Sequence, residues 1–140
     1  MRSFSQVDVF SSTPLGGNPV AVVHDADGLT DEQMQRFAAW TNLSETTFLL
    51  APTTAEADYR LRIFTPSAEL PFAGHPTLGS AHAWLSTGGS PHTPGELVQE
   101  CGAGLVRLRA GERLAFAAPP MTRFGEVSPD DIASLCRALR

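Results

Sequence analysis

Pro71-Phe72-Ala73-Gly74-His75-Pro76-Thr77 is the stretch that decides the fold, because it opens a long segment of small and apolar residues. Proline in the first turn of a helix is a helix-start signal. The residues that follow are mostly small or apolar, namely Leu78, Gly79, Ala81, Ala83, Trp84 and Leu85. A helix that is apolar nearly all round belongs in the interior of a domain. The pattern therefore predicts a buried helix over residues 76–85, ended by the glycines and proline of residues 88–91.

Short strand signals surround this helix on both sides in the sequence. They are alternating or apolar runs bounded by turn residues, at residues 4–10, 20–24, 46–50, 59–64, 97–101, 104–109 and 113–117. One buried helix among many short strands predicts an α+β fold, with a mostly antiparallel curved sheet or barrel wrapped around the central helix.

Two surface helices complete the prediction. Thr30 and Gln33 have the spacing of a capping box, and Asn42 marks the end of the helix that follows. Its expected apolar stripe consists of Met34, Phe37, Ala38 and Trp40. The second helix is expected over residues 130–139, with Ser128 as its N-cap and Ile132, Leu135 and Leu139 on one face.

Composition and charge exclude several classes of function. The chain has 140 residues, 42% of them hydrophobic and 18% charged, which is typical of one globular domain. A net charge of −5 gives no basic surface for nucleic acid or an anionic membrane. Cys101 and Cys136 form no CxxC pair, so a disulfide framework and a zinc site are not expected. With no signal-peptide pattern and no apolar run of membrane-spanning length, we expect a cytoplasmic protein.

Gly74 and His75 are the first candidates for a binding site. A helix N-terminus presents unpaired N–H groups and a partial positive charge, which suit a carboxylate. Glycine permits close approach of a ligand to the backbone, and His75 has the chemistry to donate a hydrogen bond or shuttle a proton. The alternative is that these residues only turn the chain into the helix. His75 and His82 are seven residues apart, but no third ligand has metal-site spacing, so no metal is expected.

Glu45 and Asn18 are the other candidate site residues. Glu45 lies between Leu43 and Phe48 at a predicted helix-to-strand junction, and a carboxylate among apolar neighbours suits general acid/base chemistry. The alternative is an ordinary solvated surface glutamate. The Asn18 amide, which follows two glycines, has the chemistry to orient a substrate carboxylate, although asparagine in such a loop is more often a turn former.

Taken in order, five motifs resemble the N-terminal half of the PhzF-like phenazine-biosynthesis family. They are Gln6-Val7-Asp8-Val9-Phe10, the run from Gly17-Asn18-Pro19 to Val23, Asn42-Leu43-Ser44-Glu45-Thr46-Thr47-Phe48, Leu61-Arg62-Ile63-Phe64-Thr65-Pro66, and Leu70-Pro71-Phe72-Ala73-Gly74-His75-Pro76-Thr77. The resemblance covers nearly the whole chain. It is most specific up to Leu85 and becomes mainly a pattern of strands beyond it.

The resemblance implies a fold and a chemistry. The family is similar in fold to diaminopimelate epimerase, in which two pseudo-symmetric lobes each wrap a sheet around a central helix and the active site lies between them. Glu45 matches the family's acid/base glutamate, and Asn18, Gly74 and His75 match positions beside the substrate. The implied function is an isomerase that shifts a proton next to a carboxylate in a small cyclic amino-acid-like substrate, without metal or organic cofactor.

Two departures from the family pattern bear on this expectation. Ala73 stands where related epimerases carry the first of two catalytic cysteines, so thiol-based racemisation is not expected. Family members are also about twice as long. We therefore expect residues 1–140 to form a single N-terminal lobe without the second one, completed by a homodimer or by a separate C-terminal lobe chain. The alternative is a non-catalytic half-domain that binds small carboxylates, or a truncated inactive product.

Overall fold

The computed structural model describes residues 2–118, 120 and 125–139. Its elements in chain order are β1 (Phe4–Val9), β2 (Asn18–Val23), α1 (Asp31–Thr41), β3 (Thr46–Leu50), β4 (Tyr59–Phe64), β5 (Glu69–Leu70), α2 (Gly74–Ser86), β6 (Glu96–Cys101), β7 (Gly104–Ala110), β8 (Leu114–Phe116) and α3 (Pro129–Ala138). The predicted strands are all present. β5 was not predicted, and it is a two-residue strand that pairs with the end of β4.

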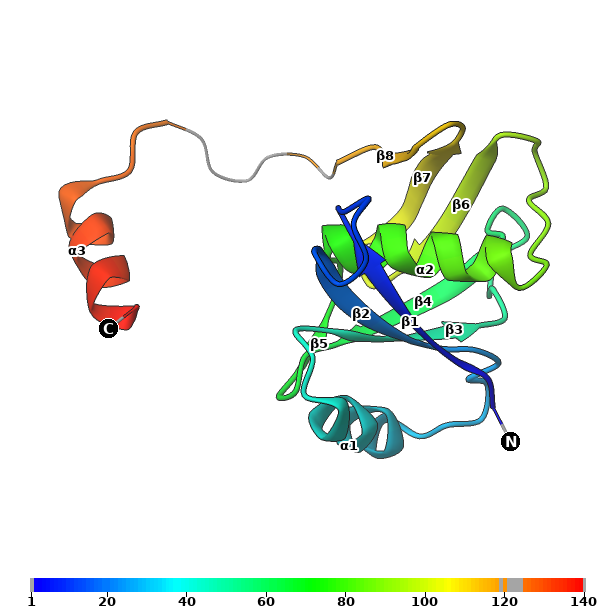
Figure 1. The fold of residues 1–140 in the computed structure, drawn as a ribbon, viewed down its shortest axis with the longest axis horizontal. Coiled ribbons are helices and arrows are strands. Elements are labelled where there is room, and N and C mark those ends of the chain that lie inside the picture. Colours follow the sequence, from blue (N-terminus) through cyan, green and yellow to red (C-terminus); the bar gives the residue numbers. More distant parts are fainter. Residues whose placement is uncertain (1, 119, 121–124, 140) are drawn as a thin grey trace.

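The strands form one curled sheet in the order β1-β2-β3-β4-β6-β7-β8, with β5 beside β4. Five of the strand pairs are antiparallel, and two pairs, β2 with β3 and β4 with β6, are parallel. Figure 1 shows the sheet curving around α2, while α1 covers its outer face. The α+β prediction of a mostly antiparallel curved sheet around a central helix is therefore confirmed.

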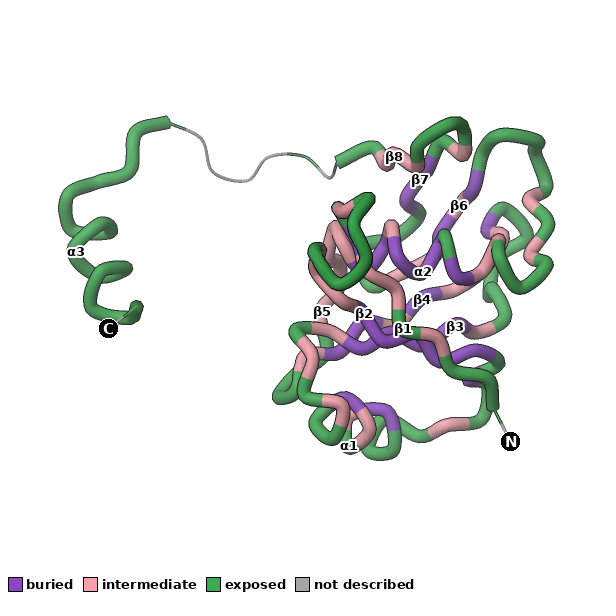
Figure 2. The backbone as a smooth tube through the Cα atoms, viewed as in Figure 1, coloured by how far each residue is buried: buried purple, intermediate pink, exposed green. Residues whose placement is uncertain are grey.

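Helix α2 is buried because small residues let the strands approach it closely. The tightest approach is at Gly79, where an added Cβ would lie 2.4 Å from Cγ1 of Val20 and 2.9 Å from Cγ2 of Val9. Figure 2 shows the buried residues gathered along α2 and the strands that face it. The helix begins at Gly74, two residues before the predicted start at Pro76. Proline fits there because the first helical N–H groups have no partner within the helix.

Buried polar side chains fix α2 to the sheet. The Thr47 hydroxyl donates to the Ala21 carbonyl at 3.1 Å and lies 2.8 Å from the Ser80 hydroxyl. One turn earlier in the helix, the Gln99 amide donates to the Thr77 hydroxyl at 3.1 Å.

The same Gln99 side chain accepts a hydrogen bond from the Tyr59 hydroxyl at 3.3 Å. Burial raises the pKa of Tyr59 above its ordinary range, and the neighbouring acidic groups of Asp58 and Cys101 add to this shift. Tyr59 therefore stays a neutral donor to Gln99.

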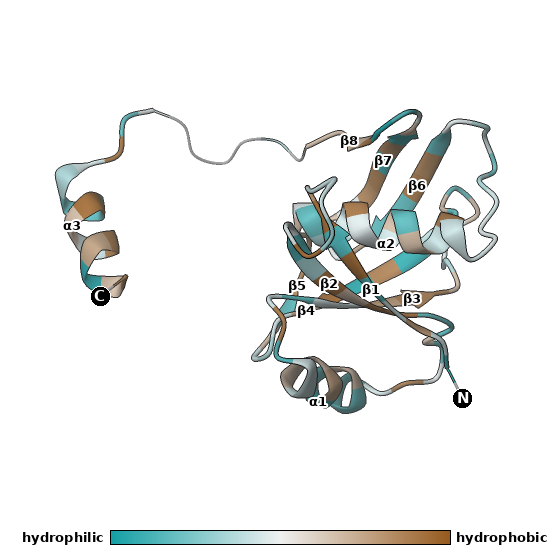
Figure 3. Cartoon of the chain, in the orientation of Figure 1, coloured by the Kyte–Doolittle hydropathy of each residue, from teal (hydrophilic) through white to brown (hydrophobic). Residues whose placement is uncertain are grey.

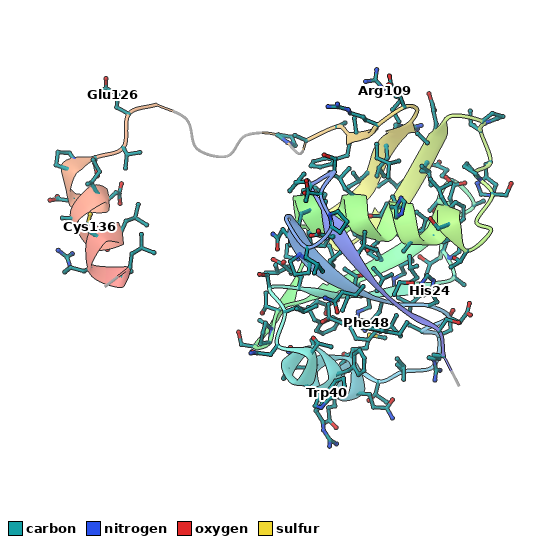
Figure 4. All side chains as sticks on the ribbon, in the orientation of Figure 1. His24, Trp40, Phe48, Arg109, Glu126 and Cys136 are labelled. Atoms are coloured by element: carbon teal, nitrogen blue, oxygen red, sulfur yellow. The ribbon has the colours of Figure 1, made fainter. Side chains whose placement is uncertain are left out.

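Helix α1 encloses a second, smaller core on the other face of the sheet. The capping box of Thr30 and Gln33 is confirmed, and Asn42 ends the helix in a left-handed conformation with φ of 53°. Met34 and Ala38 are buried against Phe48, as predicted for the apolar stripe. Trp40 does not belong to that stripe, because it is 78% exposed (Figure 4). Its position on the helix lies well to the side of Met34 and Ala38.

Helix α3 differs from the rest of the chain because it buries none of its residues (Figure 2). The Ser128 hydroxyl accepts from the Asp131 N–H at 3.1 Å, which confirms the predicted N-cap. The helix is amphipathic as predicted, and Figure 3 shows its hydrophobic positions as brown bands. Ile132, Leu135 and Leu139 are all exposed. Within the described ranges, no helix has the length and hydropathy required to cross a membrane.

Candidate active site

The N-terminus of α2 lacks a side-chain cap. Ala73 occupies the N-cap position and offers no side-chain hydrogen bond, while its carbonyl accepts from the Thr77 N–H at 3.2 Å. The N–H groups of Gly74 and His75 belong to the first helical turn, where no carbonyl of the helix can reach them. This end of a 13-residue helix also carries the partial positive charge of the helix dipole. The arrangement favours an anionic group in front of Gly74 and His75.

Glu45 is positioned by the connection between α1 and β3. The left-handed Asn42 reverses the chain, and the Thr41 and Thr46 hydroxyls lie 2.6 Å apart across the turn. Thr46, the residue after Glu45, is fully buried, and its burial fixes the backbone next to Glu45. The Glu45 carbonyl accepts from the Ala21 N–H at 3.4 Å, so the Glu45 backbone continues the pairing of β3 with β2.

The side chains of Glu45 and His75 meet at this helix end. Oε2 of Glu45 lies 3.3 Å from Nε2 of His75, and only 16% and 10% of the two side chains are exposed. The two atoms are not aligned for a hydrogen bond, and each is a buried polar atom without a partner among the described residues. Buried polar groups are normally paired, since an unpaired one costs about 1–3 kcal/mol. This pair therefore has free hydrogen-bonding capacity that a ligand can use.

Of the other predicted site residues, Gly74 is adjacent to the pair in the fold, and Asn18 lies further along β2. Asn18 begins β2 opposite Val9, three residues before Ala21, whose N–H binds the Glu45 carbonyl. Gly74 is the first residue of α2, next to His75. An added Cβ at Gly74 would lie 3.2 Å from Cζ of Phe116, so this glycine also makes room for a ring of β8.

Phe10 is a neighbour of the site for which the sequence predicted no site role, although it ends the first of the five motifs. Its ring centroid lies 6.5 Å from that of His75, at an interplanar angle of 52°. The sequence shows Phe10 only as the last apolar residue of a strand, which predicts packing and not a place beside a histidine. Its contact with His75 depends on the loop between β1 and β2, whose path the sequence does not specify.

The described residues show no group of three or more His, Cys, Asp or Glu side chains that could hold a metal ion. His82 is exposed on the surface of α2. Cys101 and Cys136 are both free cysteines. Among the described residues, Glu45 and His75 form the titratable pair in contact at the helix start.

Comparison with known proteins places this chain in a family. The family model described as phenazine biosynthesis-like protein, PhzC-PhzF, matches residues 7–139. The protein named antisense-enhancing sequence 1 of Schizosaccharomyces pombe is 58% identical over 107 residues, which are 76% of this chain and 36% of that protein. Trans-2,3-dihydro-3-hydroxyanthranilate isomerase of Pseudomonas aeruginosa is 57% identical over 83 residues, which are 59% of this chain and 30% of that protein.

A solved structure agrees with these sequence matches. The crystal structure of the Bacillus anthracis phenazine biosynthesis protein of the PhzF family superposes with a TM-score of 0.69 at 38% identity, covering 76% of this chain and 34% of that one. The chain spans about a third of the length of the curated relatives described above. A family match over almost the whole chain, joined to a shared fold, shows that this protein belongs to the PhzC-PhzF family of phenazine biosynthesis-like proteins.

Proposed function

We propose that this chain supplies the acid/base half of an isomerase site, in which Glu45 shifts a proton on a small cyclic amino-acid-like substrate next to its carboxylate. The observation that carries the proposal is the unpaired Glu45–His75 contact of 3.3 Å at the uncapped start of α2. Membership of a family with a named isomerase supports the same reaction class.

The chemistry follows from the charges at this end of the helix. The substrate carboxylate binds the N–H groups of Gly74 and His75, where the helix dipole favours a negative charge. The Glu45 carboxylate takes a proton from a carbon of the ring, and the electron pair left behind spreads into the adjacent unsaturated system. Glu45 then returns the proton to another carbon, so the reaction moves a double bond without any net oxidation. His75 stabilises the charge that develops in between.

We further propose that the reaction requires a partner chain and uses no metal or organic cofactor. We propose that a second copy of the chain, or a separate C-terminal lobe chain, completes the site around the unpaired Glu45–His75 contact. A homodimer would bring two Glu45 side chains to one site. Size-exclusion chromatography with light scattering measures this directly, and the homodimer predicts twice the 14.9 kDa mass of the chain. A particle with the mass of one chain, unchanged across concentrations, would contradict the homodimer.

Deuterium incorporation tests the proton shift. The chain is incubated in heavy water with trans-2,3-dihydro-3-hydroxyanthranilate, the compound in the name of the Pseudomonas aeruginosa relative, and the product is read by mass spectrometry. We expect incorporation to fall at least about 100-fold in Glu45→Gln, because the amide cannot accept the proton. Glu56→Gln, which changes an exposed glutamate in the loop before β4, is the matched control and keeps the wild-type rate. Equal rates in wild type and Glu45→Gln would refute the acid/base role.

A second function is favoured by the uncapped start of α2 itself, because that feature binds a carboxylate whether or not turnover follows. In that case the chain is a non-catalytic binding half-domain. Anthranilate binding, followed by the NMR signal of His75, would persist in Glu45→Gln, and neither protein would incorporate deuterium.

A further inference from the structure

The loop from Phe10 to Gly17, between β1 and β2, exposes two large apolar side chains in an unfavourable backbone conformation. Phe10 has φ of 69° and is 74% exposed, and Leu15 has φ of 62° and is 96% exposed. A bulky residue in the left-handed region is uncommon, because its side chain crowds the backbone. Such conformations concentrate at functional sites, where the surrounding structure holds them in place.

Hydrogen bonds hold the loop in this shape. Both carboxylate oxygens of Asp8 accept from the Gly17 N–H, at 3.0 and 3.2 Å. The Ser11 hydroxyl donates to the Thr13 carbonyl at 2.8 Å. An added Cβ at Gly17 would lie only 2.2 Å from the Val9 carbonyl oxygen, so this residue must be glycine. The exposed position of Phe10 is therefore fixed by the loop and does not result from a lack of structure.

Phe10 and Leu15 differ in what lies next to them. The Phe10 ring is 6.5 Å from the His75 ring, and it also lines a groove of about 840 Å³ that runs along α2 past Leu78 and His82. Leu15 is not among the residues that line this groove. Phe10 thus lies between the Glu45–His75 pair and an open groove, with most of its ring free to be covered.

We propose that Phe10 is a specificity-determining residue that selects planar, unsaturated cyclic carboxylates by stacking on the ring of the substrate. This inference rests on the proposed function. Glu45, His75 and the start of α2 supply only polar groups, whereas a cyclic substrate also has two apolar faces to bury. Aromatic rings interact favourably with other π systems in offset or edge-to-face geometry, in addition to the area that they bury. The Phe10 ring supplies that surface beside His75.

Two probes with the same net charge test the selection. Anthranilate is planar and carries a carboxylate beside an uncharged arylamine, and 2-hydroxycyclohexanecarboxylate carries a carboxylate beside an uncharged hydroxyl on a saturated ring. Dissociation constants are measured on the full chain by NMR titration. We expect wild type to prefer anthranilate, and Phe10→Ala to weaken anthranilate binding about fivefold while changing the saturated probe less than about twofold. Phe10→Leu, which keeps apolar bulk without a π system, should lose the same preference.

Leu15→Ala is the matched control, since it removes another exposed apolar side chain from the same loop. It should keep the wild-type preference for anthranilate. An unchanged preference in Phe10→Ala overturns the inference, and so does an equal weakening of both probes, which would mean that Phe10 buries either ring without selecting the planar one. If wild type binds both probes equally, the result supports the carboxylate site and refutes the selective role of Phe10. If wild type binds neither, the proposed function fails together with this inference.

Discussion

Buried polar side chains lie against the body of α2 and at its N-terminal end, and only those against the body of the helix have hydrogen-bond partners among the described residues. Thr47 binds Ser80, and Gln99 links Thr77 to Tyr59, so these hydroxyl and amide groups have partners. At the helix start, Oε2 of Glu45 and Nε2 of His75 lie 3.3 Å apart without a hydrogen bond. The difference distinguishes polar groups that stabilise the fold from polar groups that the fold leaves available.

Among changes to the paired buried side chains, Gln99→Ala should have the largest effect on the free energy of unfolding. Gln99 is fully buried, and its loss leaves a cavity and removes the partner of both Thr77 and Tyr59. We expect the free energy of unfolding to fall by about 3 kcal/mol. Urea denaturation followed by tryptophan fluorescence measures the change, with Glu112→Ala in the exposed turn before β8 as the control. A loss below about 1 kcal/mol would show that this polar chain contributes little to stability.

Thr47→Val should have a smaller effect, because the shape of the side chain is kept. Valine lacks the hydroxyl that lies 2.8 Å from the Ser80 hydroxyl, so the expected loss is about 1–2 kcal/mol. Removing both partners, in Thr47→Val with Ser80→Ala, should cost less than the sum of the two single changes. The same denaturation experiment supplies all the terms of this double-mutant cycle, and simple additivity would mean that the two hydroxyls do not interact.

His24 is also a buried polar side chain with a partner, and it is a titratable group. Burial lowers its pKa below the ordinary value of 6.5, an effect that the charge of Asp25 partly opposes. Its Nε2 lies 2.9 Å from the Ser5 hydroxyl. The unfolded chain therefore binds a proton at a higher pH than the folded chain, so stability is fully present above about pH 6.5 and is lost as the pH falls below that value.

His24→Gln should remove this pH dependence, with an effect smaller than that of Thr47→Val. The measurement compares urea midpoints of wild type and variant at pH 7.5 and pH 5.5, where only the wild type should lose its share of stability. Parallel losses in both proteins would assign the pH dependence to other groups.

Glu45→Gln should have the smallest effect on stability, although it has the largest effect on the proposed reaction. Among the residues that the structure describes, the carboxylate has no hydrogen-bond partner, so its replacement by an amide of the same shape should change the free energy of unfolding by less than about 0.5 kcal/mol. A loss as large as that of Thr47→Val would place Glu45 with the paired structural groups. It would also remove the main support for the proposed site.

Much of the fold follows from the sequence because its signals are local. The alternation of residues 59–64 gives β4, the capping box of Thr30 and Gln33 starts α1, and Ser128 caps α3. The predictions that the structure corrected were wrong for physical reasons. The start of α2 was placed two residues late because Gly74 carries no helix-start signal, and the two-residue β5 is too short for any periodicity. Trp40 was assigned to the buried face on hydrophobicity alone, and it is exposed.

The candidate site likewise has features that the sequence predicts and features that only the fold determines. The sequence by itself determined that an apolar helix begins after Ala73, that Glu45 follows a helix-ending asparagine, and which family these motifs resemble, because each depends on residues close together in the chain. Only the tertiary structure decided that Glu45 meets His75, 30 positions further on, and that Phe10 lies beside them. These contacts are set by the curl of the sheet and by the close packing at Gly79, which depend on many distant side chains at once.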